Sequence, residues 1–140
     1  MGSNQRLTPD LARRLLAGSA QLVELFGMGP AELRDYAASG GRLWQQGRRH
    51  DAERVFRNLV ALDETVYYGH AGLGAAALEQ GILVEAEAHL RCAAACAGPD
   101  EMVFVNLGEV LVRMGKIEEG RALLEKASTS IRAKGILDGL

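Results

Sequence analysis

The residues best suited to metal chemistry lie together on one predicted helix. His89, Cys92 and Cys96 are separated by three and four residues, so their side chains share one helical face. Imidazole and thiolate groups are ligands that Zn²⁺ prefers, but a structural zinc site needs four of them. No fourth ligand is evident, and alanines fill the neighbouring positions. We therefore interpret the cysteines as small buried or flanking thiols and expect no metal site.

Other catalytic patterns are missing from the sequence. The glycines follow a repeat period and no strand precedes them, so they do not form a phosphate-binding loop. Serine and histidine residues are few and scattered, which gives no nucleophile and base pair. Asp63 and Glu64 end a predicted helix, where a solvated turn explains them. We expect a protein that is not an enzyme and needs no cofactor.

Composition limits the class of protein further. The 140 residues suit one domain, and 48% apolar with 5% aromatic residues suits a core of Leu, Ala and Val. The net charge of −2 comes from interspersed charges, so no nucleic-acid partner is expected. No apolar run approaches the roughly 20 residues that cross a bilayer, and residues 1–10 are polar, so we expect no membrane insertion and a cytoplasmic protein. Two cysteines fit a reducing compartment.

A repeat with a period of 34 residues organises the chain. Glycines recur in two sets at this spacing: Gly40, Gly74 and Gly108, and then Gly47, Gly81 and Gly115. We expect the first set to lie within helices, where the missing side chain lets a partner helix approach, and the second set to end helices. The predicted antiparallel helix pairs are 33–46 with 50–62, 67–80 with 84–97, and 101–114 with 118–133.

The repeated pattern of an aromatic residue, Leu-Gly, a glycine turn, a small residue and an apolar residue resembles the tetratricopeptide repeat. The alternative is an arbitrary alanine-rich helical bundle, which three copies in phase disfavour. The predicted fold is all-α, and the resemblance implies a right-handed α-solenoid of three helix-turn-helix repeats preceded by an N-terminal helix. We expect an N-terminal tail and helix over 1–32, repeats over 33–66, 67–100 and 101–134, and a short tail over 135–140.

The two ends of the chain carry further apolar residues. The N-terminal helix either caps the first repeat or forms a homodimer, and both roles use the face with Leu11, Leu15, Leu22 and Phe26. At the other end, the residues after Ile131 are too few for the helix that normally covers a last repeat. We expect bare apolar surface there, unless Ile136, Leu137 and Leu140 fold back over it or the chain is part of a longer protein.

A narrower resemblance is to the class II chaperones of type III secretion translocators. The segment Val55–Asp63 is similar to that family's F-x-x-L-x-x-L-D pattern, and Gly72–Ala75 to its G-L-G-A pattern, at the family's spacing. The resemblance implies a chaperone that holds a partly unfolded secreted translocator. The family's C-terminal helical extension is expected to be missing. Two other functions remain open: a generic scaffold joining folded partners, and a self-assembling regulatory subunit.

The concave side of such a solenoid is lined by the first helix of each repeat, and we call the predicted lining the trough. Its small floor residues and two large aromatic side chains suit a peptide with apolar anchors. Trp44 has a second interpretation, as a core residue packed against the N-terminal helix. By helical phase, the trough comprises Arg34, Ala37, Gly41, Trp44, Tyr68, Ala71, Ala75, Leu78, Met102, Val105, Glu109 and Val112.

Overall fold

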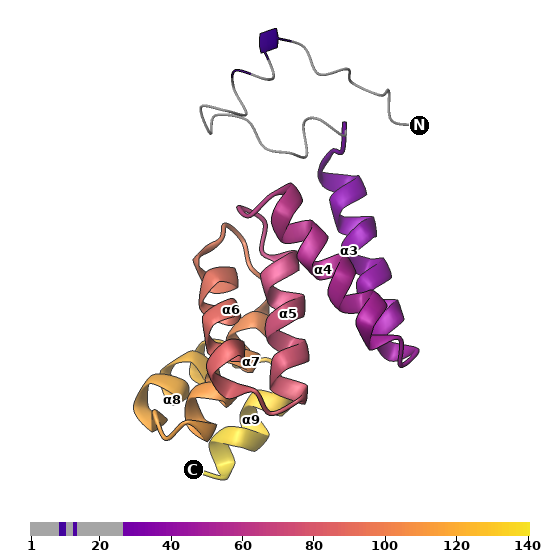
Figure 1. The fold of residues 1–140 in the computed structure, drawn as a ribbon. Coiled ribbons are helices and arrows are strands. Elements are labelled where there is room, and N and C mark those ends of the chain that lie inside the picture. Colours follow the sequence, from indigo (N-terminus) through magenta and orange to yellow (C-terminus); the bar gives the residue numbers. More distant parts are fainter. Residues whose placement is uncertain (1–8, 11–12, 14–26) are drawn as a thin grey trace. The chain divides into compact units, whose positions relative to one another are not determined.

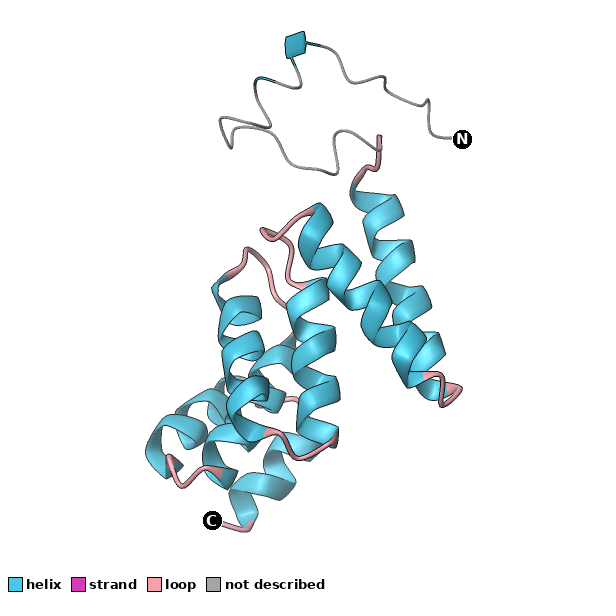
Figure 2. Cartoon of the chain, viewed as in Figure 1, coloured by secondary structure: helices cyan, strands magenta, loops and turns pink. Residues whose placement is uncertain are grey.

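The computed structural model describes residues 9–10, 13 and 27–140. The candidate capping or dimerisation residues Leu11, Leu15, Leu22 and Phe26 lie outside the described part. The described chain divides into two compact units, with the boundary between Glu64 and Thr65. All of its regular elements are helices (Figures 1 and 2). This confirms the predicted all-α class.

The first unit contains one pair of helices, α3 (Pro30–Gln45) and α4 (Arg49–Leu62), which pack together. Pro30 occupies the first turn of α3, where its missing N–H costs nothing, and the Gly29 N–H donates to Glu32 Oε2 at 3.0 Å. Between the two helices lies Gly47, with φ of +78°. This left-handed conformation favours glycine and reverses the chain within a few residues.

The second unit contains two further pairs and one more helix. The pairs are α5 (Tyr68–Glu79) with α6 (Leu83–Ala95), and α7 (Glu101–Arg113) with α8 (Ile117–Lys126). The last helix, α9 (Ile131–Asp138), packs on α7 and α8. Gly81 and Gly115 repeat the left-handed turn of the first unit, with φ of +76° and +81°. The predicted role of this glycine set in ending helices is confirmed.

The other glycine set brings paired helices into close contact. A Cβ atom added to Gly74 would lie 2.5 Å from Leu90 Cγ, and one added to Gly108 would lie 2.7 Å from Leu124 Cγ. In the first unit, a Cβ on Gly40 would lie 2.7 Å from Phe56 Cε1. These separations are below any normal contact distance, so the prediction that these positions admit a partner helix is confirmed.

The C-terminal end differs from the sequence expectation. The predicted single helix over 118–133 is wrong: α8 ends at Lys126, and Ser130 begins α9 by accepting a hydrogen bond from the Ala133 N–H at 3.2 Å. Most of the expected tail over 135–140 therefore belongs to a helix. The expected absence of a C-terminal helix over the last repeat is also wrong, because α9 buries Ala133 fully.

Two apolar clusters hold the second unit together. The first joins α5, α6 and α7 through Leu78, Leu90 and Leu111. The second joins α7, α8 and α9 through Val105, Leu124 and Ala133, which are all fully buried, with Ile136 and Leu137 packed against them. The expectation that Ile136, Leu137 and Leu140 cover the end of the last repeat is thereby confirmed for Ile136 and Leu137, but it is wrong for Leu140, which is 42% exposed. No helix in the described part is long and apolar enough to cross a membrane.

Candidate peptide-binding site

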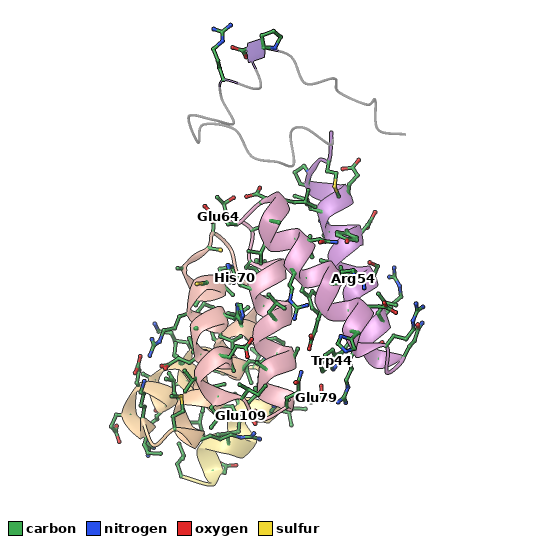
Figure 3. All side chains as sticks on the ribbon, viewed as in Figure 1. Trp44, Arg54, Glu64, His70, Glu79 and Glu109 are labelled. Atoms are coloured by element: carbon green, nitrogen blue, oxygen red, sulfur yellow. The ribbon has the colours of Figure 1, made fainter. Side chains whose placement is uncertain are left out.

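The part of the predicted trough on α3 is partly exposed to solvent. Arg34 is exposed, while Ala37, Gly41 and Trp44 are half-buried. Nothing lies within 4 Å of a Cβ added to Gly41, so a ligand backbone can approach there. The Arg49 guanidinium of α4 lies 5.0 Å from the Trp44 ring centroid, a cation–π distance. Trp44 itself is near the C-terminal end of α3 (Figure 3). Trp44 therefore has one packed face and remains partly accessible, and its role in binding stays a prediction.

The part of the trough on α5 contains fewer residues than predicted. Tyr68, Ala71 and Ala75 are half-buried and provide a surface of small residues beside one aromatic ring. Leu78 is only 5% exposed and belongs to the core with Leu90 and Leu111. Its assignment to the trough is corrected here, because α6 and α7 cover it.

Tyr67, which the sequence analysis did not single out, extends the aromatic surface of α5. Its ring centroid lies 4.6 Å from that of Tyr68. Burial raises the pKa of the Tyr67 hydroxyl, and the charges of Tyr68 and Asp100 raise it further. Tyr67 is therefore a neutral hydrogen-bonding group at the start of α5 at physiological pH. The repeat alignment gave no signal for it, because the equivalent positions hold Leu33 and Glu101.

On α7 the trough is partly covered by α9. Met102 is 44% exposed, but Val105 is fully buried and Val112 packs against the same α9 cluster. The assignment of Val105 to a ligand-contacting surface is corrected, because α9 lies against that edge of α7. Glu109 is only 12% exposed at its side chain and forms ion pairs with Arg113 of α7 and Arg132 of α9. Glu109 is therefore not a free acidic group in the trough.

The two arginines around Glu109 were also missed from the sequence. Arg113 could have been found, because it follows Glu109 by four residues on the same helix. Arg132 could not, because the expected helix over 118–133 placed it in a different element. Arg132 also donates through Nη1 to Asn106 Oδ1 at 2.8 Å, which ties the start of α9 to the middle of α7.

The helix pair α5–α6 contains a histidine contact. His70 Nδ1 and His89 Nδ1 lie 3.1 Å apart, so one ring donates an N–H to the other. His70 occupies the repeat position held by Tyr36 and Phe104, and the Tyr36 hydroxyl likewise contacts Asn58 at 3.0 Å. His89 therefore serves helix pairing. Among the described residues, no group of three or more histidine, cysteine or acidic side chains is placed to hold a metal ion.

The two cysteines of the candidate metal face lie near the end of α6. Cys92 is exposed and Cys96 is half-buried. The Cys96 thiol donates to the Cys92 carbonyl oxygen at 3.3 Å, a contact within the helix. This arrangement agrees with the interpretation of both as flanking thiols.

A hollow of about 430 Å³ lies away from the trough, on α6, α7 and α8. Alanine and leucine residues form its floor, including Leu107 and Leu123, and Arg91 and Lys126 lie at its rim. Arg91 is engaged by Glu119 and Glu87, which raise the pKa of its guanidinium. This hollow could not be predicted from the sequence, because it combines residues from three helices.

Paired helices, left-handed glycine turns and close-approach glycines together define a tetratricopeptide-type helical repeat. The family model of the tetratricopeptide repeat matches residues 102–126, which cover most of α7 and α8. Comparison with curated proteins finds no match.

Solved structures with the same fold include several proteins of type III secretion. The Yersinia enterocolitica type III secretion translocator chaperone SycD has a TM-score of 0.71 at 20% identity, over 86% of this chain and 98% of SycD. A type III secretion complex from Aeromonas hydrophila has a TM-score of 0.72 at 20% identity, over 94% of each chain. PcrH in complex with the chaperone-binding region of PopD has a TM-score of 0.65 at 20% identity, over 81% of this chain and 93% of PcrH. The chain thus has the fold of these chaperones.

Proposed function

We propose that this chain is a non-enzymatic chaperone that holds an extended, apolar segment of a secreted translocator in the bacterial cytoplasm before type III export. The observation that carries the proposal is the likeness to SycD over nearly the whole length of that protein. SycD has been solved with a peptide of the translocator YopD, and PcrH with the chaperone-binding regions of PopD and PopB.

The predicted trough residues of α5 in the second unit, and those of α3 in the first, each have the chemistry that this role requires. Ala71 and Ala75 are small and half-buried, so a peptide backbone can lie close to α5. Tyr68 and Trp44 add aromatic area with few rotatable bonds, which lowers the entropy cost of binding. Apolar side chains of an unfolded segment would lose water contact on these surfaces, which both favours binding and prevents aggregation.

A homodimer belongs to the same proposal. SycD has been described in an alternative dimer. We propose that the face with Leu11, Leu15, Leu22 and Phe26 forms either the dimer contact or a cap for the first repeat. Only in the capping role would the first repeat, over 33–66, receive apolar cover from the N-terminal segment over 1–32.

A generic scaffold remains the second candidate because the fold alone does not decide function. MamA, whose structure has a TM-score of 0.61 at 20% identity over 94% of this chain, also has this fold. A scaffold would join folded partners, whereas a chaperone binds an unfolded segment. The experiment below separates the two.

The test is co-expression with translocator candidates from the same organism, followed by affinity capture and measurement of the soluble fraction. We compare the natural chain with a Trp44→Ala, Tyr68→Ala variant, and with an Ile82→Ala, Val84→Ala control whose exposed apolar residues lie outside the trough. Circular dichroism checks that each variant is folded. We expect the natural chain and the control to keep a membrane-active translocator soluble, and the trough variant to lose it. Capture of only folded partners, equally by all three proteins, would contradict the chaperone role.

A further inference from the structure

A cluster of charged groups joins α7 to α9 at the edge of the trough. Glu109 Oε1 accepts from Arg113 Nη2 at 2.6 Å, and Glu109 Oε2 accepts from Arg132 Nη2. Arg132 Nη1 donates to Asn106 at 2.8 Å. Both oxygens of the Glu109 carboxylate therefore accept from an arginine, and the Glu109 side chain is 12% exposed.

The balance of charge in this cluster is positive. It contains two guanidinium groups and one carboxylate, so one positive charge is not compensated within it. Each guanidinium carries five N–H donors, of which the contacts above use one or two. The Arg113 and Arg132 side chains are 51% and 45% exposed, so the remaining donors are open to solvent.

The cluster lies on the same helical stripe as an exposed apolar side chain. Met102, Asn106, Glu109 and Arg113 are spaced by four, three and four residues, which places them along one face of α7. Met102 is 44% exposed at the start of this stripe. At about 1.5 Å per helical residue and about 3.3 Å per extended residue, the distance to the arginines corresponds to about three to five residues of an extended peptide.

We propose that Arg113 and Arg132 form a binding site for a carboxylate of the bound peptide, an Asp or Glu three to five residues from an apolar anchor that contacts Met102. The inference rests on the proposed function and adds one requirement for the ligand. Guanidinium groups match a carboxylate in a planar, bidentate geometry, which an amide or a hydroxyl does not reproduce with equal strength. Glu109 positions both arginines and lowers the net charge of the cluster from two to one.

The structural alternative is that these ion pairs only fasten α9. Arg113 separates the two explanations, because it belongs to α7 and its replacement leaves the Arg132 contacts to Asn106 and Glu109 in place. If these ion pairs only fasten α9, the affinity for a peptide should not depend on the charge of that peptide.

The experiment uses an array of short synthetic peptides with two leucine anchors in an Ala-Ser background, with Glu, Gln or Lys placed in turn at each other position. Binding of the full chain is measured by fluorescence anisotropy. We expect Glu to be preferred over Gln by about fivefold at one register, with Lys weakest there, because exposed ion pairs contribute modestly. The preference should fall as ionic strength rises from about 0.05 M to about 0.5 M.

Three variants decide the assignment. Arg113→Gln with Arg132→Gln should abolish the preference for Glu and keep binding of the Gln peptides, whereas Arg113→Gln alone should reduce it. Glu109→Gln removes the carboxylate that competes for both arginines and keeps a side-chain oxygen that can accept from one of them, so it should strengthen binding of Glu peptides. Arg91→Gln is the matched control, since Arg91 also bridges two acids, Glu87 and Glu119, but on α6 and α8. Arg91→Gln should leave the preference for Glu peptides unchanged.

The failures of the two proposals are distinguishable. Peptides that bind with equal affinity whether they carry Glu or Gln overturn the carboxylate site and leave the chaperone role standing. An acid preference that survives in the double arginine variant also overturns it. If no leucine-containing peptide binds, the proposed function itself is contradicted.

Discussion

Helices α3 and α7 hold equivalent positions in the repeat, yet they are buried to very different degrees. On α3 the buried residues are Leu33 and Gly40, whereas α7 buries six residues, among them Val105 and Leu111. Within its own unit α3 packs on α4, while α7 packs on α5, α6, α8 and α9. The repeat therefore sets which residues face a neighbouring helix, and the neighbouring helix decides whether those residues are core or surface.

Three positions 34 residues apart show this directly. Ala37, Ala71 and Val105 share one repeat position, but the first two are half-buried and the third is fully buried. The larger residue occurs where α9 covers it. A trough assigned by helical phase alone therefore overestimates the ligand surface in the last repeat.

The largest effect is expected for a residue that the last helices bury completely. Leu124→Ala should lower the free energy of unfolding by about 3 kcal/mol, because Leu124 is fully buried among α7, α8 and α9 and truncation leaves a cavity. Val84→Ala is the control, since Val84 is 73% exposed and its truncation should change stability by less than about 0.5 kcal/mol. Chemical denaturation measures both. Equal losses would show that burial does not separate the two positions.

A second test compares two glycines within first helices. Gly74→Ala should destabilise by about 1–3 kcal/mol, because its Cβ would lie 2.5 Å from Leu90 Cγ and 3.3 Å from the Leu90 backbone nitrogen. Gly41→Ala has open space and should stabilise by about 0.5–1 kcal/mol through higher helix propensity. Thermal unfolding of both variants provides the measurement. A loss at Gly41 as large as that at Gly74 would refute the close-approach explanation.

The smallest expected effect concerns the ion pairs between the last two repeats. Hydrogen bonds from Lys116 and Arg91 lower the pKa of the Glu87 carboxyl below its ordinary value of 4.5. The folded protein thus binds this proton less readily than the unfolded chain, so the stabilisation is complete above about pH 4.5 and is lost as pH falls through the lowered pKa.

We expect Glu87→Gln to lower the free energy of unfolding at pH 7 by about 1 kcal/mol or less, because Lys116 and Arg91 are 44% exposed and solvent screens the pairs. The difference from the natural chain should shrink as pH falls below about 4.5, which denaturation across a pH series would show. Glu125→Gln is the control, because Glu125 is an exposed glutamate on α8. A difference that grows on acidification would contradict this account.

The sequence predicted local features well and non-local ones less well. The period of 34 residues placed the glycine turns at Gly81 and Gly115 and the helix pairs around them, because helices and turns depend on nearby residues. The break between α8 and α9 was missed, although Ser130 is a good N-cap residue and provided a signal. The burial of Leu78 and Val105 was missed because it depends on helices that are distant in sequence. Arg132, the partner of Glu109 on α9, was missed for the same reason.

The docking of α9 also affects how the second unit opens. A helix of eight residues is not stable by itself in water, so α9 depends on Ser130, Ala133 and its contacts with α7. Amide protons of α9 should therefore exchange with solvent earliest among the helices of this unit, and those of α8 should follow as Leu124 loses its cover. The slowest exchange is expected around Leu90 and Leu111, where three helices meet. The last repeat would then unravel from its C-terminal end while the middle repeat keeps its structure.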